Sequence, residues 1–411
     1  MGKVYCIVGN GVAGDAAASV IKERDPESEI IVFTEEGKAL YNRILLKEFA
    51  KGKLNQNSVD IRDEDWYLNR EIDIRLNTQI TRIDSENKII EVNKGGHQKY
   101  DQVLVATGGT PRELNVPNSG AEGIHHFWTM RDTIGIRNHA ETASFGAVIG
   151  AGLLGIDLAA ICGAHGVESK YIMRGDVWWR NALSKVGGEI IHKSLRDRNV
   201  LPVFNKEIEC FEERRGKVQA VVTTDGERHE ADFVGVAVGL DYNIELIQNT
   251  GVEYRNGIVV DEHMFTGVEG IYAAGDIARY HDVIIGEELQ NGSWGSAKKQ
   301  GMVAGENMVN GKDYKKFEWV PSYSITHFEY PIISFGHPTE GEKFLEKKYS
   351  ENEWRRLAFK HGRLIGGVLI GDVSSQSRYK KIITEKVEQV DQEMSILDKK
   401  IDLEKIVVKK A

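Results

Sequence analysis

Two glycine-rich turns are the residues whose types and spacing point most directly to chemistry. They are Gly9, Gly11 and Gly14 after the apolar run 4–8, and Gly150, Gly152 and Gly155 after the run 147–149. In a GxGxxG turn between a strand and a helix, the first glycine permits the tight turn, the second lets backbone approach a pyrophosphate, and the third lets the helix pack on the strand. The helix N-terminus then offers free N–H groups to the phosphates. Two such copies favour two dinucleotide sites over turns that merely pack.

Short apolar strands must position these turns. Strands at 30–33 and 171–173 follow the two glycine-rich helices, so each turn lies in a strand-helix-strand unit. Two further strands end in glycine-rich turns, within 101–113 and 231–246. The segment GIYAAGDIA places Asp276 just after a strand and a glycine. There its carboxylate would accept a hydrogen bond from a ligand hydroxyl or, in the alternative, cap a following helix.

Length and composition indicate a globular protein of two or three domains, because 411 residues exceed the usual domain size of about 150. The formal charge of -9 argues against a nucleic-acid partner for the chain as a whole. The three cysteines, Cys6, Cys162 and Cys210, form no CxxC pair, so we expect neither a disulfide framework nor a cysteine-rich metal site. The apolar stretch 145–167 contains six glycines and Asp157, which argues against a membrane span. We expect a cytoplasmic protein without a secretion signal.

The C-terminal part of the chain consists of short strand-like runs separated by Gly, Pro or Asn, and the last two runs flank the hairpin turn 361–363. These runs predict a small, mainly antiparallel domain. Beyond them, apolar residues from Ile383 to Ile401 recur every three or four positions, which is typical of one face of a helix. We expect this helical tail to pack on its own domain, with a contact to a partner or a second copy as the alternative.

In chain order, the motifs are GxGxxG, ATGGTP, GxGxxG, VGLDYN and GIYAAGD. This order resembles the two-nucleotide flavoprotein reductases of the pyridine nucleotide-disulfide oxidoreductase superfamily over residues 1–312. YNRILL (41–46), GLLGID (152–157) and the closing GRLIGGVLIGD are similar to the branch of NAD(P)H-rubredoxin reductases and the flavin modules of assimilatory nitrite reductases.

The resemblance implies an α/β fold with two Rossmann-like dinucleotide-binding domains, the second inserted in the first, plus a small α+β C-terminal domain. The implied domains are an FAD-binding domain at 1–111 and 241–312, an NAD(P)H-binding domain at 112–240, a mainly antiparallel β domain at 313–384 and the helical tail at 385–411.

The resemblance also implies which residues bind the cofactors. The first turn would hold the FAD pyrophosphate, Glu35 the adenosine ribose with Glu36 as the neighbouring candidate, and Asp276 the ribitol chain. Arg43 would lie near flavin and pyrophosphate, and Trp294 near the isoalloxazine unless it is simply core. The full set of candidates is Gly9, Gly11, Ala13, Gly14, Glu35, Arg43, Ile80, Thr107, Gly108, Gly150, Gly152, Leu153, Leu154, Gly155, Arg174, Arg180, Gly239, Gly275, Asp276 and Trp294.

The chain departs from parts of the superfamily. It lacks the CxxxxC pair of disulfide reductases and the single cysteine that peroxidase and coenzyme A-disulfide relatives carry near the position of Arg43. Thiol chemistry is therefore not expected. Ferredoxin reductases of oxygenase systems pair a Lys beside flavin N5 with a Glu in the pyridine-nucleotide helix. Lys47 and Asp157 are the corresponding catalytic candidates, and Glu48 beside Lys47 leaves open whether the pair is shifted or absent.

The end of the second strand in the second unit bears on nucleotide preference. NAD-specific sites place Asp or Glu there, on the ribose 2′-OH, whereas NADP sites place Arg. Here Met173 fills the acidic position, followed by Arg174 and later Arg180. This spacing resembles the paired arginines of NADPH-dependent glutathione reductases and favours NADPH over NADH. In the alternative, both arginines are solvated and the site accepts either nucleotide.

Together these inferences predict an FAD-dependent NAD(P)H:acceptor oxidoreductase. With no second redox group encoded, electrons would pass from the flavin to an external acceptor, a small electron-transfer protein such as rubredoxin or a partner metalloenzyme subunit. The alternatives are an NAD(P)H oxidase that reduces oxygen, and a non-catalytic flavoprotein subunit or redox-sensing scaffold. A homo-oligomer stays open. We expect no nucleic-acid partner, no membrane insertion and no metal ligand.

Overall fold

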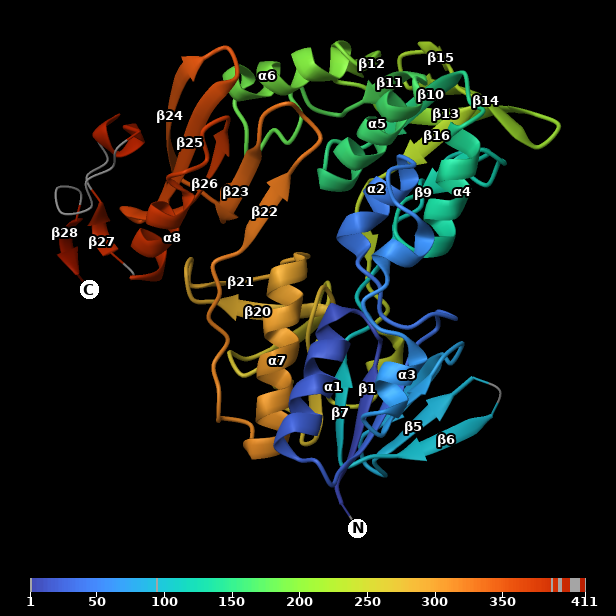
Figure 1. Cartoon of the computed structure of the whole chain (residues 1–411), viewed down its shortest axis with the longest axis vertical. Coiled ribbons are helices and arrows are strands. Elements are labelled where there is room, and N and C mark those ends of the chain that lie inside the picture. Colours follow the sequence, from blue (N-terminus) through green and yellow to red (C-terminus); the bar gives the residue numbers. More distant parts are fainter. Residues whose placement is uncertain (1, 94, 386, 391–393, 400–406, 411) are drawn as a thin grey trace. The chain divides into compact units, whose positions relative to one another are not determined.

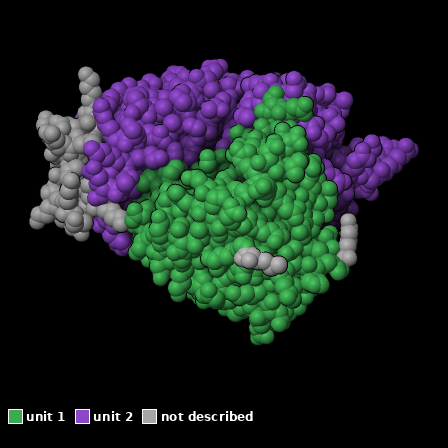
Figure 2. Space-filling view, turned by 60° about the horizontal axis from the view of Figure 1, so that its bottom comes forward, with its two compact units in different colours: residues 1–42, 57–110, 241–321 green, residues 43–56, 111–240, 322–411 purple. Residues whose placement is uncertain are grey.

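The computed structural model describes residues 2–93, 95–385, 387–390, 394–399 and 407–410. It divides into two compact units, which Figure 2 colours separately. Unit 1 comprises residues 1–42, 57–110 and 241–321, and unit 2 comprises residues 43–56, 111–240 and 322–411. Each unit is thus assembled from segments far apart in the sequence. The predicted assignment of separate domains to FAD and to NAD(P)H stays a prediction.

A five-stranded parallel sheet forms the centre of unit 1. Its order is β19 (Ile271–Ala273), β7 (Gln102–Val105), β1 (Val4–Val8), β2 (Glu29–Phe33) and β3 (Ile72–Arg75). Strand β1 is a continuous apolar run that is almost entirely buried, as expected for a parallel strand covered on both faces. Because β1 pairs with β2 on one side and β7 on the other, the first glycine-rich turn lies at the carboxyl end of the strand where the sheet order reverses. Open α/β sheets bind ligands at such a point.

Two helices of unit 1, α1 (Val12–Arg24) and α7 (Trp294–Asn310), lie side by side (Figure 1). Their approach depends on small residues, because a Cβ at Gly301 would overlap the backbone of Ala13 and one at Gly305 would lie 2.9 Å from the Ala17 carbonyl oxygen. The other elements of unit 1 are α3 (Glu64–Leu68), η3 (Glu245–Ile247), the sheet β4 (Ile80–Asp84), β5 (Ile89–Val92) and β6 (Gly96–Lys99), and the sheet β18 (Ile258–Val260), β20 (Ala278–Asp282) and β21 (Glu287–Leu289).

Unit 2 contains a second five-stranded parallel sheet with the same layout. Its order is β12 (Val200–Val203), β11 (Glu168–Ile172), β10 (Phe145–Ile149), β16 (Phe233–Val236) and β9 (Ile124–His126). The second glycine-rich turn follows β10, the counterpart of β1. Its helices are α4 (Met130–Ala140), α5 (Leu153–His165) and α6 (Lys185–Arg196), and a hairpin sheet joins β13 (Ile208–Arg214), β14 (Lys217–Thr223) and β15 (Arg228–Glu230). The predicted α/β fold with two Rossmann-like sheets is confirmed.

The short segment 43–56 also belongs to unit 2 and carries η1 (Arg43–Leu45), α2 (Leu46–Ala50) and the start of η2 (Gln56–Val59). The chain passes between the units again near the two-residue strands β8 (Thr110–Pro111) and β17 (Leu240–Asp241).

An antiparallel sheet forms the last part of unit 2, and α8 (Gln376–Thr384) contacts it. The predicted hairpin is confirmed, since β25 pairs with β26 across a turn in which His361 and Gly362 have positive φ. The indole of Trp354 packs so closely on α6 that a Cβ at Gly187 would lie 2.9 Å from the ring. The strand order is β22 (Ser322–Ile325), β23 (Ile332–Gly336), β26 (Arg363–Ile370), β25 (Glu353–Lys360) and β24 (Lys343–Ser350).

The chain beyond α8 does not continue as the predicted helix. It forms β27 (Val387–Val390), which pairs antiparallel with β28 (Val407–Lys410), and η4 (Met394–Leu397) lies between them in the sequence. The predicted helical tail is therefore wrong for these segments. Its remaining positions, at 391–393 and 400–406, lie outside the described residues. A spacing of three and four positions carries no information on the pairing of two strands that are distant in the sequence.

Candidate active site

The first glycine-rich turn has a different environment at each glycine. A Cβ at Gly9, whose φ is +105°, would overlap the carbonyl of Ala106, and one at Gly14 would overlap the carbonyl oxygen of Gly9. Gly9 and Gly14 therefore allow β1, β7 and α1 to pack closely against one another at the turn. At Gly11 the backbone is extended, with φ -77° and ψ -176°, and a Cβ would meet no atom within 4 Å. Only Gly11 faces open space, at the N-terminus of α1.

The second turn repeats this geometry in unit 2. A Cβ at Gly150 would overlap the Ala237 carbonyl, and one at Gly155 would overlap the carbonyl oxygen of Gly150. Gly152 is the N-cap of α5, with φ -96° and ψ -173°, and its Cβ position is empty to 4 Å. The indole N–H of Trp178 donates to the Gly152 carbonyl at 3.3 Å and so fixes the position of the turn. Each unit thus offers one open backbone turn of the kind that receives a pyrophosphate.

Further polar groups of unit 1 fit a dinucleotide at the first turn. The buried side-chain atoms Thr107 Oγ1 and Asn10 Nδ2 have no hydrogen-bond partner among the described residues. Such buried groups normally have a partner, which a bound ligand would supply. Asp276 is half-buried, and its carboxylate lies 3.4 Å from the Cβ position of Gly292. Because Asp276 is followed by a turn and strand β20, it caps no helix, and the capping alternative is excluded.

The remaining FAD candidates are placed as follows. Glu35 is exposed just beyond β2, whereas Glu36 accepts a hydrogen bond from the Tyr41 hydroxyl at 2.6 Å, which favours Glu35 as the ribose ligand. Ile80 is buried at the start of β4, and Trp294 is half-buried at the first position of α7. The other candidates in unit 1 are Ala13 in α1, Gly108 after β7, and Gly275 beside Asp276.

In unit 2, Arg43 donates from Nη1 to the Trp128 carbonyl at 2.7 Å, and its guanidinium lies 5.3 Å from the centre of that indole ring. Leu153 and Leu154 open α5 directly after the second turn. Gly239 follows β16 with φ +123°.

Lys47 and Asp157 form an ion pair within unit 2, with Nζ and Oδ1 3.6 Å apart. Both side chains are largely buried, at 10% and 19% exposure. Helix α2, which carries Lys47, is held against α5 because His165 Nε2 contacts the Ala50 carbonyl at 2.8 Å. The Arg137 guanidinium also lies 5.1 Å from the Phe49 ring. The Lys–Asp pair that the sequence could not establish is therefore present, and it is formed by Lys47 and Asp157. The neighbouring Glu48 pairs with Lys51.

Two residues that the sequence did not single out complete this cluster. His327 Nε2 contacts Asp157 Oδ1, and His327 Nδ1 lies 2.8 Å from Lys51 Nζ. Burial lowers the pKa of Lys51. Burial also lowers the pKa of His327; the hydrogen bond and charge of Asp157 act to raise it, but burial together with the ammonium groups of Lys51 and Lys47 outweighs them. Burial acts to raise the pKa of Glu48, but the hydrogen bonds and charges of Lys51 and Lys53 outweigh it and leave the pKa lowered. No sequence motif connects these residues, because the contacts span 170 and 276 positions.

The two arginines proposed for nucleotide preference lie together after β11. Arg174 and Arg180 are both exposed, and the Arg180 side chain crosses Gly175, whose Cβ position is 2.9 Å from Arg180 Cδ. Trp178, which lies between them in the sequence, is fully buried and anchors this segment. Two guanidinium groups thus flank the loop that follows the second strand of unit 2.

The cysteines are free thiols. Cys6 and Cys162 are fully buried in β1 and α5, and Cys210 is half-buried in β13. Burial raises the pKa of Cys6 to about 12 and that of Cys162 to about 11. A thiol is nucleophilic only as thiolate, so these two are unsuited to redox chemistry at neutral pH.

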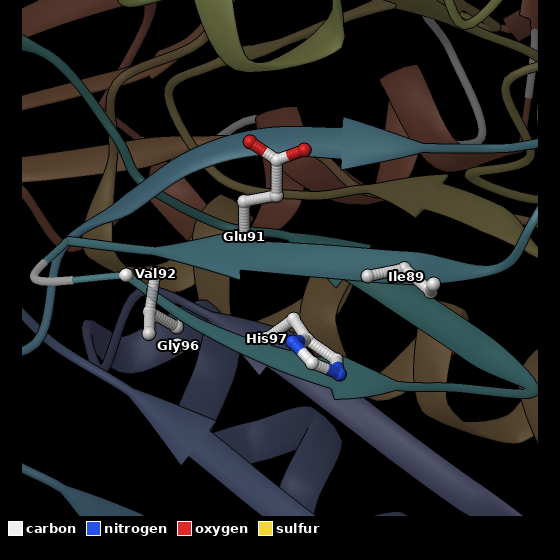
Figure 3. A pocket seen from close by; sticks show the side chains of 6 residues that line it. Ile89, Glu91, Val92, Gly96 and His97 are labelled. Atoms are coloured by element: carbon white, nitrogen blue, oxygen red, sulfur yellow. The ribbon is translucent and has the colours of Figure 1, made fainter.

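Within the described part of the chain, no cluster of three or more His, Cys, Asp or Glu side chains is arranged to hold a metal ion. A pocket on the β5–β6 hairpin is lined by Ile89, Glu91, Val92 and His97 (Figure 3), and none of the predicted site residues lines it. Among the helices that the structure describes, none is both long and apolar enough to span a bilayer.

Comparison with known families gives two matches. Residues 3–301 match the family Pyridine nucleotide-disulphide oxidoreductase, and residues 321–387 match the Rubredoxin NAD+ reductase C-terminal domain. The first match includes both glycine-rich turns, Lys47 and Asp157, and the second includes His327.

Individual relatives agree with these matches. Nitrite reductase (NAD(P)H) of Bacillus subtilis (strain 168) is 28% identical over 381 residues, which cover 92% of this chain and 46% of the relative. The chain therefore spans about half the length of that relative. NADH-rubredoxin oxidoreductase of Clostridium acetobutylicum is 26% identical over 92% of this chain and 93% of its own. A ferredoxin reductase structure from Rhodopseudomonas palustris has a TM-score of 0.91 and 22% identity, over 98% of this chain and 99% of that chain, and shows the shared fold.

Proposed function

Because the chain belongs to the pyridine nucleotide-disulphide oxidoreductase family, we propose that it is an FAD-dependent NAD(P)H reductase of a small electron-transfer protein, rubredoxin or a related carrier. The observation that carries the proposal is the pair of open glycine-rich turns, one in each unit, at Gly11 and Gly152. A relative that matches over 93% of its length is named NADH-rubredoxin oxidoreductase, and residues 321–387 match the Rubredoxin NAD+ reductase C-terminal domain. A cytoplasmic location stays a prediction.

The residues of unit 1 would hold FAD. The N–H groups at the start of α1 would bind the pyrophosphate, Glu35 the adenosine ribose and Asp276 the ribitol hydroxyls. Thr107 Oγ1 would gain the hydrogen-bond partner that it lacks among the described residues. FAD, when bound, accepts a hydride from NAD(P)H and passes electrons on singly.

The residues of unit 2 would bind and orient NAD(P)H. The N–H groups of Gly152 and Leu153 would face its pyrophosphate at the N-terminus of α5. We assign the Lys47–Asp157 ion pair to the reacting end of the site, where a buried ammonium stabilises developing negative charge more strongly than it would in water. Asp157 would hold the Lys47 side chain in place there through this ion pair.

Steady-state kinetics with competing acceptors tests this function. The purified protein is expected to be yellow, to be bleached by NADPH or NADH, and to turn over faster with added rubredoxin than with oxygen alone. Faster turnover with oxygen would replace the proposal by an NAD(P)H oxidase. An FAD-bound protein that both nucleotides reduce only very slowly would indicate a non-catalytic flavoprotein subunit or redox-sensing scaffold.

Preference for NADPH is a separate prediction that rests on Arg174 and Arg180. Each guanidinium would make a charge-assisted contact with the 2′-phosphate. Because both side chains are exposed, we expect each contact to contribute about 1.5 kcal/mol, the lower end of the usual range, so that the Arg174→Ala/Arg180→Ala variant loses roughly 150-fold in the ratio of kcat/KM for NADPH over NADH. Arg196→Ala, in the last turn of α6, is the control because Arg196 pairs with Glu189. An unchanged ratio in the double variant would exclude both arginines from the nucleotide site.

A further inference from the structure

A single histidine from the C-terminal sheet region contacts both a carboxylate of α5 and an ammonium of α2. His327 lies in the loop after β22, and its side chain is only 1% exposed. Nε2 faces Asp157 and Nδ1 faces Lys51 Nζ at 2.8 Å. Asp157 in turn pairs with Lys47, and Lys51 pairs with Glu48 at 3.0 Å. Five titratable side chains from three segments of the chain thus form one continuous series of contacts.

The partners of His327 determine its protonation. A lysine ammonium can only donate hydrogen bonds, so Nδ1 must be the acceptor toward Lys51. Nε2 must then carry the ring hydrogen and donate it to the Asp157 carboxylate. His327 is therefore neutral in this arrangement. The two ammonium groups of Lys47 and Lys51 are balanced by the two carboxylates of Asp157 and Glu48, which satisfies the requirement that buried charges be paired.

The two aromatic residues that follow His327, Phe328 and Tyr330, anchor its loop. The Tyr330 hydroxyl donates to the Ile190 carbonyl of α6 at 2.9 Å and contacts Ser194 Oγ at 2.6 Å. The Arg198 guanidinium lies 5.6 Å from the ring of Phe328, the residue next to His327. These contacts hold the histidine against α5. Its approach to Asp157 is therefore a consequence of how the C-terminal sheet packs on α6.

We propose that His327 is a positioning residue of the active site, which holds the Asp157 carboxylate directed at Lys47 and makes reduction of the bound flavin dependent on pH. The proposal rests on the proposed function, because it assigns the Lys47–Asp157 pair to the reacting end of the site. It adds a contribution from the C-terminal domain that neither glycine-rich turn nor the nucleotide sheets supply.

The direction of the pH dependence follows from the charges that face His327. These are Asp157 on α5 and Lys47 and Lys51 on α2. Protonation would place a third positive charge in a cluster that holds two carboxylates, Asp157 and Glu48, and would remove the hydrogen-bond acceptor at Nδ1, so the neutral form is the working form. Since the pKa of His327 lies below its ordinary value of about 6.5, the arrangement is complete at neutral pH and is lost as the pH falls through that lowered pKa.

Variants of His327 separate positioning from mere packing. His327→Gln retains an amide donor toward Asp157 and an amide oxygen toward Lys51 but does not titrate. We expect its rate of flavin reduction by NAD(P)H, measured by stopped flow, to fall by about 3- to 10-fold at pH 8. The decrease of this rate at low pH, which is the acid limb of the wild-type pH profile, should be absent in this variant. His327→Leu, which offers neither contact, should fall roughly 10-fold further, so that glutamine gives partial rescue.

Lys51 provides a sharper test, because removing its charge should raise the pKa of His327. In Lys51→Met we expect the acid limb to move to higher pH by about half to one unit. Lys53→Met is the matched control, since Lys53 is 64% exposed, pairs with Glu48 and makes no contact with His327 among the described residues. Its acid limb should coincide with that of the wild type.

Nitrogen-15 NMR of histidine-labelled holoenzyme gives a readout apart from activity. The resonances that disappear in His327→Gln should show protonated Nε2 and unprotonated Nδ1 at pH 7, and their titration should follow the acid limb. Protonated Nδ1 at pH 7, or an unmoved acid limb in Lys51→Met, would overturn the inference and leave the proposed function standing. Holoenzyme that neither nucleotide reduces would overturn both, whatever the NMR titration shows.

Discussion

Gly11→Val is expected to yield a folded protein that does not retain FAD. The backbone at Gly11 is extended and its Cβ position is empty to 4 Å, so valine costs the fold little. The same space is where the turn would receive the pyrophosphate of FAD. Displacing about two charge-assisted hydrogen bonds from backbone N–H groups, at about 1.5 to 3 kcal/mol each, predicts a Kd for FAD raised roughly 150- to 25,000-fold. Flavin absorbance per mole of purified protein and fluorescence titration of the apoprotein measure this.

Gly14→Val is the contrast for this experiment. A Cβ at Gly14 would overlap the carbonyl oxygen of Gly9, so the substitution should lower the stability of the fold itself. Thermal unfolding of the apoproteins separates the two cases, with Tm near that of the wild type for Gly11→Val and clearly lower for Gly14→Val. Stoichiometric FAD in Gly11→Val would show that the first turn is not the pyrophosphate site.

Gly152→Val should give the complementary phenotype, a yellow protein that NAD(P)H cannot reduce. Gly152 has the same extended backbone and the same empty Cβ position as Gly11, but it lies at the N-terminus of α5 in unit 2. By the same estimate of about two lost charge-assisted hydrogen bonds, the apparent Kd for NAD(P)H should rise roughly 150-fold or more, while FAD content is retained. Stopped-flow reduction at increasing nucleotide concentration measures this Kd.

Chemical reduction is the internal control for Gly152→Val. Dithionite should bleach its flavin as completely as that of the wild type, because the FAD site in unit 1 is untouched. Reduction by NAD(P)H with an unchanged Kd would mean that the second turn does not bind the nucleotide. Loss of FAD from this variant would mean that the two turns are not independent sites.

The sequence was informative wherever a feature depends on neighbouring residues. Strand β1 and the hairpin β25–β26 were predicted because strands and tight turns impose patterns over only a few residues. The two strand-turn-helix units were visible for the same reason, since the three glycines of each turn lie close together in the sequence and Gly14 packs against Gly9 of the same turn.

The same reasoning failed at the end of the chain. The spacing of apolar residues from Ile383 onward fits one face of a helix, yet β27 pairs with β28 at residues 407–410. Strand pairing of this kind depends on a partner distant in the sequence, and tertiary contacts override a short periodic pattern.

The sequence alone was enough to predict two dinucleotide turns, the α/β class and the absence of a redox cysteine pair, because each of these depends on short stretches of neighbouring residues. Only the tertiary structure decided that Lys47 forms an ion pair with Asp157 and that His327 joins them. The contact of His327 with Asp157 spans 170 positions and that with Lys51 spans 276. Both contacts of His327 form because the C-terminal sheet packs on α6, where Trp354 covers Gly187. A contact between elements so distant in the sequence produces no periodic pattern of residues from which it could be predicted.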